Sequence, residues 1–355
     1  MNQILCPGDI EKLREIIKIK QQNNDVSWML CDYLNNDPCF VAKELIDSVN
    51  VDGILPEETV FFALLEGWCG LDPETNERDR LLAFEYLRRA IKQLDVKSYI
   101  ENPYYRNIKI PEVKFGNWEL TYQKYKPYEA FIYKDLVVES DFKEYPCVGF
   151  FNEEFKFPSV LEKGHEWMSI KPSEIETIQP ALDEIEGRVV TFGLGLGYFA
   201  YMASIKPNVK SITVIERDNE VIKLFNQFIL PQFQMKEKVE IISADAFEYA
   251  EKRMPVQNFD YAFVDLWHDV SDGLDLYLRM KKLEDLSSST KFLYWIENSL
   301  LSGFRFKIFD WVVANSRSFD EIVRCLSFPA LQKLAAVKAS ALSELIGSLE
   351  MENNE

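Results

Sequence analysis

Apolar residues recur at helical spacing through the first hundred positions. After Asp9, a candidate N-cap, apolar side chains stand at 10, 13, 16 and 17, which is the spacing of one helix face. Pro38 and Pro56 precede two further predicted helices, at 40–49 and 59–65, where a first turn tolerates proline. The strongest periodicity predicts a helix over 77–95. We therefore expect residues 1–102 to form a helical N-terminal domain.

The pattern changes after Pro103. From 104 to 160, aromatic and aliphatic residues alternate with polar ones, as they do at 115, 118, 120 and 122. A period of two in β-favouring residues predicts short antiparallel strands. Asn152 and Glu153 stand between two such runs and predict a hairpin turn. We expect residues 103–160 to form a small β-rich segment.

Fully apolar runs alternate with helical patterns in the stretch that follows. The runs predict strands at 189–192, 212–215, 239–242, 261–264 and 292–296. The patterns predict helices at 198–204, 220–228, 247–253 and 274–286. Such an alternation is typical of a parallel sheet covered on both faces. Residues 161–327 are thus predicted to form an α/β domain with a Rossmann-like doubly wound sheet, followed by a helical tail at 328–355. Its ligand is expected beyond the carboxyl ends of the strands.

Composition narrows the class of protein. No apolar run in the 355 residues approaches the ~20 positions of a membrane span, and residues 1–20 lack the apolar core of a signal peptide. The six cysteines are scattered without a CxxC pair, and there are only two histidines. These counts give no pattern typical of a metal site or a disulfide framework. We expect a cytoplasmic protein that holds no metal and does not associate with membranes.

The charge is strongly acidic. Forty basic and 58 acidic residues give a net charge of −18. A field of this sign repels phosphate backbones, so we expect no nucleic-acid partner. The charge fits plain solubility, and an acidic site for a cationic substrate is the alternative interpretation.

The sharpest motif is VVTFGLGLGY at 189–198. An apolar strand leads into Gly193, Gly195 and Gly197, and a helix then begins at Tyr198. Glycine permits positive φ and lets a ligand approach the backbone, while the helix start presents free N–H groups. The motif predicts a small-molecule site, although a purely structural turn uses the same glycines.

An acidic residue follows each of the next three predicted strands. These residues are Glu216, Asp245 and Asp265. A single acid after a strand is usually a helix cap or part of a solvated loop, but three at one sheet edge behind a glycine turn indicate a ligand site. Glu216 is placed to accept from ribose hydroxyls, Asp245 from an adenine amino group, and Asp265 to reach the reacting end of the ligand.

Residues 189–269 resemble the cofactor half of class I S-adenosylmethionine-dependent methyltransferases, and most of all the spermidine synthase-like branch. The segments ITVIERDNEVI at 212–222 and FDYAFVD at 259–265 carry the resemblance. GHEWM at 164–168 is similar to the short stretch that precedes the fold in spermidine synthases. The branch also has an N-terminal β domain, which fits the predicted β-rich segment.

The resemblance implies S-adenosyl-L-methionine as cofactor and methyl transfer to a small-molecule acceptor, such as an amine, or to a protein. Carried over position by position, it implies a cofactor-binding set of Gly193, Gly195, Gly197, Tyr198, Glu216, Asp245, Ala246 and Asp265. Within this set the glycines pass close to the methionine part, Glu216 holds the ribose, and Asp245 with Ala246 holds the adenine.

Two departures from the branch count against polyamine synthesis. Spermidine synthases have an Asp inside the glycine turn, where this chain has Leu194 and Leu196, and a second acid downstream, where it has His268 followed by Asp269. The turn is better suited to the intact cofactor. An amine or hydroxyl acceptor must lose a proton, so Asp265 and His268 are the candidate catalytic residues.

Three alternatives stay open. Aminopropyl transfer fits the acidic charge. A nicotinamide-binding Rossmann fold fits the GxGxxA frame that begins at Gly195, with Glu216 at the distance of a ribose, but it leaves Asp245 and Asp265 without a role. A non-catalytic scaffold would bind a protein partner through the helical N-terminal domain, but it has no reason to keep all three acids.

Overall fold

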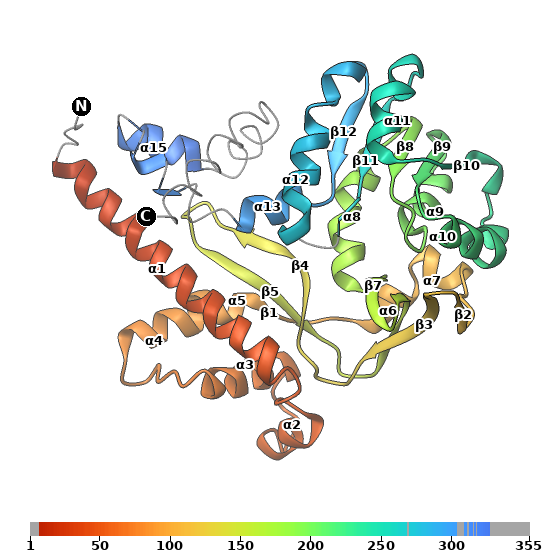
Figure 1. The fold of residues 1–355 in the computed structure, drawn as a ribbon. Helices are drawn as coiled ribbons and strands as arrows, with labels where there is room; N and C mark the ends of the chain where they lie inside the picture. Colours follow the sequence, from red (N-terminus) through yellow and green to blue (C-terminus); the bar gives the residue numbers. More distant parts are fainter. Residues whose placement is uncertain are drawn as a thin grey trace. The chain divides into compact units, whose positions relative to one another are not determined.

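The computed structural model describes residues 7–267, 270–303, 309–310, 312–314, 316 and 318–326 (Figure 1). The chain divides into two compact units. Unit 1 comprises Met1–Leu94, Tyr125–Phe155 and Asn298–Glu355, and unit 2 comprises Asp95–Lys124 and Lys156–Glu297. The predicted β-rich segment 103–160 is thus shared between the units. The predicted tail 328–355 lies outside the described residues.

Unit 1 consists of helices and a three-stranded sheet. Its helices are α1 (Pro7–Asn36), α2 (Lys43–Val49), α3 (Glu57–Trp68), α4 (Glu77–Leu82), α5 (Arg88–Ala90) and α15 (Phe319–Leu326), and α13 (Glu297–Gly303) begins at the last residue of unit 2. Its strands are β1 (Ile91–Gln93), β4 (Phe131–Val138) and β5 (Glu144–Phe150), in the order β1-β5-β4. Strand β5 runs parallel to β1 and antiparallel to β4.

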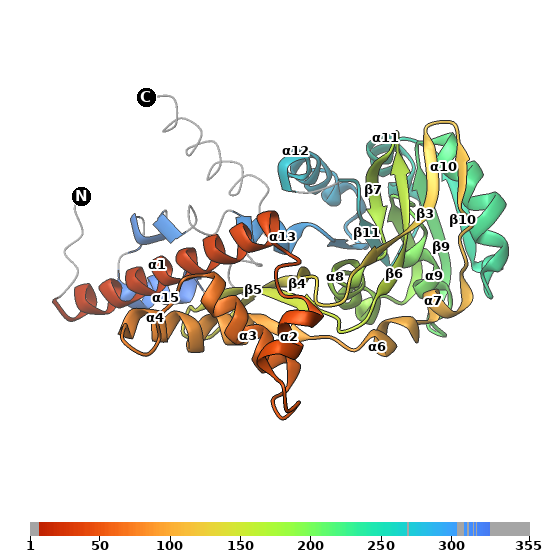
Figure 2. The same ribbon diagram turned by 90° about the horizontal axis from the view of Figure 1, so that it is seen from below.

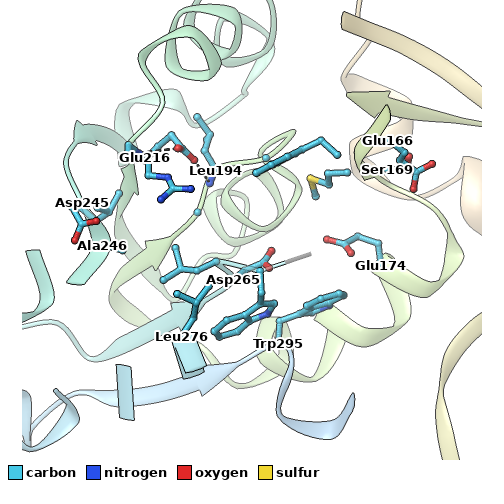
Figure 3. Close-up of a pocket in the computed structure, with 18 of the residues that line it drawn as sticks. Glu166, Ser169, Glu174, Leu194, Glu216, Asp245, Ala246, Asp265, Leu276 and Trp295 are labelled. Atoms are coloured by element: carbon cyan, nitrogen blue, oxygen red, sulfur yellow. Dashed lines mark hydrogen bonds between the residues drawn. The ribbon is translucent and has the colours of Figure 1, made fainter. Parts of the chain in front are cut away.

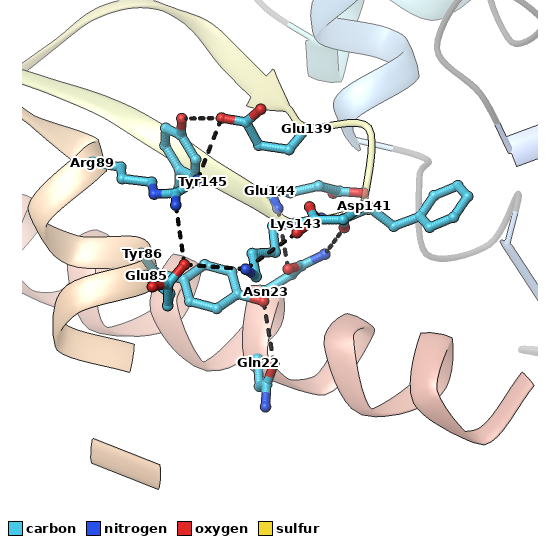
Figure 4. A network of polar contacts seen from close by, with 11 residues as sticks. Gln22, Asn23, Glu85, Tyr86, Arg89, Glu139, Asp141, Lys143, Glu144 and Tyr145 are labelled. Atoms are coloured by element: carbon cyan, nitrogen blue, oxygen red, sulfur yellow. Dashed lines mark hydrogen bonds and ion pairs between the residues drawn. The ribbon is translucent and has the colours of Figure 1, made fainter. Parts of the chain in front are cut away.

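The core of unit 1 joins its helices to this sheet. Phe61 of α3 stacks on Phe150 of β5, with ring centroids 4.1 Å apart. On α1, the buried Asn23 donates its side-chain N–H to the Phe142 carbonyl at 2.9 Å and accepts from the Glu144 N–H at 3.1 Å. Figure 4 shows this pair of bonds within a wider polar network that fixes the β4–β5 loop to α1.

Two local predictions in unit 1 were wrong. The helix predicted over 77–95 contains a π-helical turn at Ala83–Leu87 and ends at Ala90, because Ile91 pairs with Val148 and so extends the sheet. No hairpin forms at Asn152, because the strands on either side of it belong to different sheets. Tertiary pairing, which local periodicity does not register, decides both places.

Unit 2 carries two sheets and seven helices among its described residues. The helices are α6 (Val96–Ile100), α7 (Pro103–Asn107), α8 (Pro172–Glu184), α9 (Tyr198–Ser204), α10 (Asn219–Leu224), α11 (Ala246–Lys252) and α12 (Val270–Lys281). One sheet has the order β2-β3-β6-β7 and is formed by β2 (Val113–Phe115), β3 (Trp118–Tyr125), β6 (Phe155–Glu162) and β7 (His165–Ser169). Figure 2 shows β3, β6 and β7 of this sheet side by side.

The second sheet of unit 2 is parallel and has five strands. They are β8 (Gly187–Phe192), β9 (Val209–Glu216), β10 (Val239–Ser243), β11 (Tyr261–Val264) and β12 (Lys291–Tyr294), in the order β10-β9-β8-β11-β12. The connections between parallel strands are right-handed, so α9 and α10, which lead from β8 to β10, cover one face of this sheet. After β10 the chain crosses to β11 and continues in the opposite direction, so α11 and α12 cover the other face. The contacts of α9 with α8, and of α11 with α12, fit these two layers. The predicted Rossmann-like fold is confirmed.

The strand order places a switch point between β8 and β11. Chain connections leave the sheet in opposite directions from these two neighbours, and ligands of such folds bind at this point. The Gly193 N–H donates to the Ile215 carbonyl, and the Asp265 N–H donates to the Phe192 carbonyl, both at 2.9 Å. The glycine turn, β9 and β11 therefore meet at one edge. Among the described helices, none is both long enough and apolar enough to cross a membrane.

Candidate functional site

A cavity of about 340 Å³ lies at this switch point in unit 2. A volume of this size suits a small molecule. Six of the residues predicted to bind a cofactor line it, namely Gly193, Gly195, Glu216, Asp245, Ala246 and Asp265. Figure 3 shows Glu216, Asp245 and Ala246 at one end of the cavity, Glu174 at the other, and Asp265 between them. We call the first of these the adenosine end, after the part of the ligand that the sequence analysis expects there, and we call the part with Asp265 and Glu174 the acidic end.

The glycine turn requires glycine at two positions that line the cavity. Gly193 and Gly195 have φ of +102° and +49°. A Cβ on Gly193 would lie 2.0 Å from the Asp265 carbonyl oxygen, and one on Gly195 would lie 2.3 Å from the Met168 Sδ. A side chain on Gly193 would therefore displace the backbone, and one on Gly195 would displace the Met168 side chain at a φ that favours glycine.

Glu216 is the last residue of β9, and its carboxylate is held by backbone donors. Its Oε2 accepts from the Leu194 N–H at 3.2 Å, and its Oε1 accepts from the N–H groups of Arg217 and Asp218 at 2.8 Å each. These bonds tie the glycine turn to β9 and fix the orientation of the carboxylate. A carboxylate has about four lone-pair sites, so this one keeps acceptor capacity for a ligand in the cavity.

Asp245 is exposed and caps helix α11. Its Oδ1 accepts from the N–H groups of Phe247 and Glu248 at 3.0 and 2.9 Å. Ala246 is the first helical residue, and N–H groups of a first turn have no acceptor within the helix. An Asp245 carboxylate oxygen and the Ala246 N–H thus offer an acceptor and a donor beside each other. The Phe247 ring, with the Arg279 guanidinium 3.8 Å from its centroid, completes this wall.

The acidic end brings Asp265 together with Glu174, a residue that the sequence analysis missed. Burial raises the pKa of Asp265 to about 7. Burial, and then the nearby charge of Asp265, raises the pKa of Glu174 well above its usual range, while Lys171 lowers it. Within the described part of the chain, neither carboxyl has a hydrogen bond or an ion pair to another side chain or to the backbone. Both groups point into the cavity (Figure 3).

Three tryptophans contribute to the walls of the cavity. Trp267 is buried beside Tyr294, while the Trp295 indole N–H donates to the Thr177 hydroxyl at 2.8 Å. Trp167 meets Trp118 edge-on, with ring centroids 5.3 Å apart. A flat, largely apolar wall with a few acids is typical of a site for a small organic molecule. Among the described residues, no group of three or more His, Cys, Asp or Glu side chains is arranged to hold a metal ion.

Two residues of the predicted set do not line the cavity. Gly197 has φ of +73° and begins helix α9, where a Cβ would lie 2.2 Å from the Phe225 ring. Tyr198 is buried, and its hydroxyl accepts from the Asn102 side-chain N–H at 2.9 Å. Both positions serve the packing of unit 2. His268, the second candidate catalytic residue, lies outside the described residues.

Glu174 has only a weak signal in the sequence. Pro172 and Glu174 stand in the first turn of α8, where a proline and an acid are ordinary features of a helix start. What sets Glu174 apart is its burial, which follows from tertiary packing. Met168 has a better signal, because it belongs to the GHEWM stretch that the resemblance includes.

No protein-family model matches the sequence, and no curated protein matches it. Among solved structures, a protein assigned as a caffeoyl-CoA O-methyltransferase from Staphylococcus aureus matches 44% of this chain and 69% of its own, at 21% identity and a TM-score of 0.28. Spermidine synthase from Thermotoga maritima matches 42% of this chain, at 15% identity and a TM-score of 0.30, and this chain spans 59% of that protein. Both are proteins of the methyltransferase fold that the sequence resembles. At these scores, the strand order establishes the fold, and the function has to come from the site.

Proposed function

We propose that unit 2 binds S-adenosylmethionine and catalyses transfer of its methyl group to a small-molecule or protein acceptor. The observation that carries the proposal is the cavity at the switch point, where the glycine turn and three strand-end acids meet. Its fit to the cofactor rests on two features. Gly193 packs on the backbone of Asp265, which brings the glycine turn and this acid to the same wall of the cavity, and the Glu216 carboxylate is fixed in the place proposed for the ribose.

At the adenosine end, the chain's own groups match neutral donors and acceptors. Glu216 accepts from the ribose with the lone-pair site that its three backbone donors leave open. Asp245 accepts from the adenine amino group, and the Ala246 N–H donates to an adenine ring nitrogen. The glycine turn, whose Gly193 and Gly195 line the cavity, is the place proposed for the methionine part. These contacts orient the ligand with its sulfur toward Asp265.

At the acidic end, Asp265 is the proposed base. The cofactor supplies a sulfonium-bound methyl group for in-line displacement, and alignment of this kind is worth ~7–11 kcal/mol. Asp265 removes the proton of the acceptor, since a base works best when its pKa lies near the working pH. We propose His268, three residues further on, as a second base. Its replacement by alanine is expected to lower kcat by about 10²–10⁴-fold with little effect on cofactor affinity.

Calorimetric titration distinguishes the proposal from its alternatives. We expect a micromolar Kd for S-adenosylmethionine, which is roughly −8 kcal/mol. Decarboxylated S-adenosylmethionine tests aminopropyl transfer, and NAD tests the nicotinamide interpretation. Saturable NAD binding without any response to S-adenosylmethionine would refute the proposal, and tighter binding of the decarboxylated cofactor would favour aminopropyl transfer.

A labelled methyl group tests the transfer itself. The protein is incubated with methyl-¹³C-labelled S-adenosylmethionine and a small-molecule or protein extract, and products are sought by mass spectrometry. We expect a labelled product with the wild-type chain and about 10²–10⁴-fold less with Asp265→Asn. Cofactor binding without any transfer in either extract would favour the non-catalytic scaffold.

A further inference from the structure

Glu174 is an acid in the cavity to which the proposed methyl transfer gives no role. It stands in the first turn of α8, only 9% exposed, and its carboxyl group points into the cavity toward Asp265 (Figure 3). Asp265 reaches the same space from the end of β11. Two acidic groups from separate elements thus face one volume, and one of them is more than nine-tenths buried.

The other carboxylates of the cavity have protein partners. Glu216 accepts from three backbone N–H groups and Asp245 from two, and Glu166 forms an ion pair with Lys171 at 3.0 Å. Glu174 has no such partner among the described residues. A carboxyl group that faces the cavity without a protein donor obtains its hydrogen bonds from water or a ligand in the cavity. An arrangement of this kind is compensated when a ligand brings the missing donors.

We propose that Glu174 and Asp265 together form a binding site for a protonated amine. An ammonium group is a compact cation with three N–H donors and no acceptor, so it satisfies two carboxyl groups at once. Trp267 and Trp295 line the same cavity, and an indole ring attracts a cation that lies over its face. A hydroxyl group has a single donor and no charge, and satisfies only one of the two carboxyls.

This inference rests on the proposed function, and the amine has two possible sources there. The first is the methionine part of the cofactor, whose ammonium group is attached near the sulfur. The second is the methyl acceptor. In the second case a proton passes from the ammonium nitrogen to the ionised carboxylate of the pair. The freed lone pair then forms the N–C bond while the C–S bond breaks with its electrons going to sulfur, and the carboxyl later releases its proton to water.

The first arm of the test asks whether the amine belongs to the cofactor. S-Adenosylhomocysteine carries the amino-acid part, whereas 5′-methylthioadenosine lacks it, and both are titrated calorimetrically into the wild-type chain, Glu174→Gln and Glu176→Gln. Glu176 is a matched control, because it lies two residues further along α8, is exposed, and meets Tyr99 instead of the cavity. If the cofactor supplies the amine, Glu174→Gln weakens S-adenosylhomocysteine binding at least tenfold and leaves 5′-methylthioadenosine binding unchanged.

The second arm asks whether the amine belongs to the acceptor. Benzylamine and benzyl alcohol, which have the same shape, are titrated into protein saturated with S-adenosylhomocysteine. If the acceptor supplies the amine, the wild-type chain binds benzylamine at least tenfold more tightly than benzyl alcohol. Glu174→Gln then abolishes this preference while S-adenosylhomocysteine binding stays unchanged, and Glu176→Gln retains the preference.

The outcome that overturns the inference is distinct from failure of the proposed function. Unchanged S-adenosylhomocysteine affinity in Glu174→Gln, together with no preference of the wild-type chain for benzylamine, excludes an ammonium site. Absence of binding of both adenosine compounds to the wild-type chain refutes the proposed function instead. Thermal unfolding verifies that each variant is folded. If Glu174→Gln does not fold, both arms are repeated with Asp265→Asn, which removes the other carboxyl group of the proposed site.

Discussion

The two ends of the cavity treat their carboxyl groups in opposite ways. At the adenosine end, Glu216 and Asp245 accept hydrogen bonds from five backbone N–H groups between them. At the acidic end, Asp265 and Glu174 have no such donors among the described residues, and burial raises the pKa of both. A carboxyl group is therefore fixed by backbone donors at one end of the cavity. At the other end it is stabilised by a proton or by a bound cation.

Under the proposed function, this difference gives the acids of a single cavity separate tasks. Carboxylates bonded to the backbone are held in one orientation, which suits the recognition of neutral hydroxyl and amino groups. Asp265, whose pKa burial raises to about 7, exchanges its proton near neutral pH, which suits acid–base work. The environments, more than the residue types, separate the roles.

Among the substitutions considered, we expect the largest effect on stability and cofactor binding at Gly193, which packs against Asp265. Gly193→Ala places a Cβ 2.0 Å from the Asp265 carbonyl oxygen at a φ of +102°. Because the backbone has to move, we expect a loss of about 3–5 kcal/mol in the free energy of unfolding and no measurable cofactor binding. Chemical denaturation and calorimetry measure both. A stable variant that binds the cofactor normally would show that the turn is not packed as described.

Glu216→Ala tests the adenosine end. It removes the acceptor proposed for the ribose hydroxyls and also frees the Leu194 N–H. We expect S-adenosylhomocysteine binding to weaken by about 1–3 kcal/mol, as measured by calorimetry. Unchanged affinity in a folded variant would place the ribose elsewhere.

Glu174→Gln tests the acidic end through stability. The raised pKa values of Glu174 and Asp265 mean that the folded protein holds more protons than the unfolded chain above about pH 4, and for Asp265 this excess ends above about pH 7. The stability that these two carboxyl groups contribute is therefore fully present at low pH. It is lost as the pH rises through their pKa values in the folded protein. Because glutamine cannot ionise, we expect the variant to be more stable than wild type by about 1–3 kcal/mol at pH 8 and by less at pH 5.

Thermal unfolding at the two pH values measures this difference, with Glu176→Gln as the control for loss of one charge. A variant that is less stable than wild type at pH 8 would mean that Glu174 has a stabilising partner. It would then resemble the carboxylates of the adenosine end.

The smallest effect is expected for Asp245→Asn. Asparagine caps helices about as well as aspartate and still offers a carbonyl oxygen to the adenine amino group. We expect a change below about 0.5 kcal/mol in the free energy of unfolding, measured by chemical denaturation, and little change in cofactor affinity. Asp245→Ala, by contrast, is expected to cost about 1 kcal/mol in stability through loss of the cap. Equal effects of the two variants would mean that Asp245 does not act through its cap.

The sequence predicts the parallel sheet and the meeting of the glycine turn with three acids in one cavity, because both depend on local order along the chain. Apolar strands are followed directly by the turn at Gly193 and by Glu216, Asp245 and Asp265, and parallel strands bring their carboxyl ends to one edge. It does not predict Glu174, whose local setting is that of any helix start. Packing of α8 beside the sheet, and not periodicity, decides that burial.

A crystal structure of the chain with S-adenosylhomocysteine tests the central claim most directly. We predict the adenine beside Asp245 and Phe247, the ribose hydroxyls on Glu216, and the sulfur directed toward Asp265. Adenine lying between Trp167 and Trp295 at the acidic end, with Glu216 free of the ribose, would contradict the assignment of the two ends.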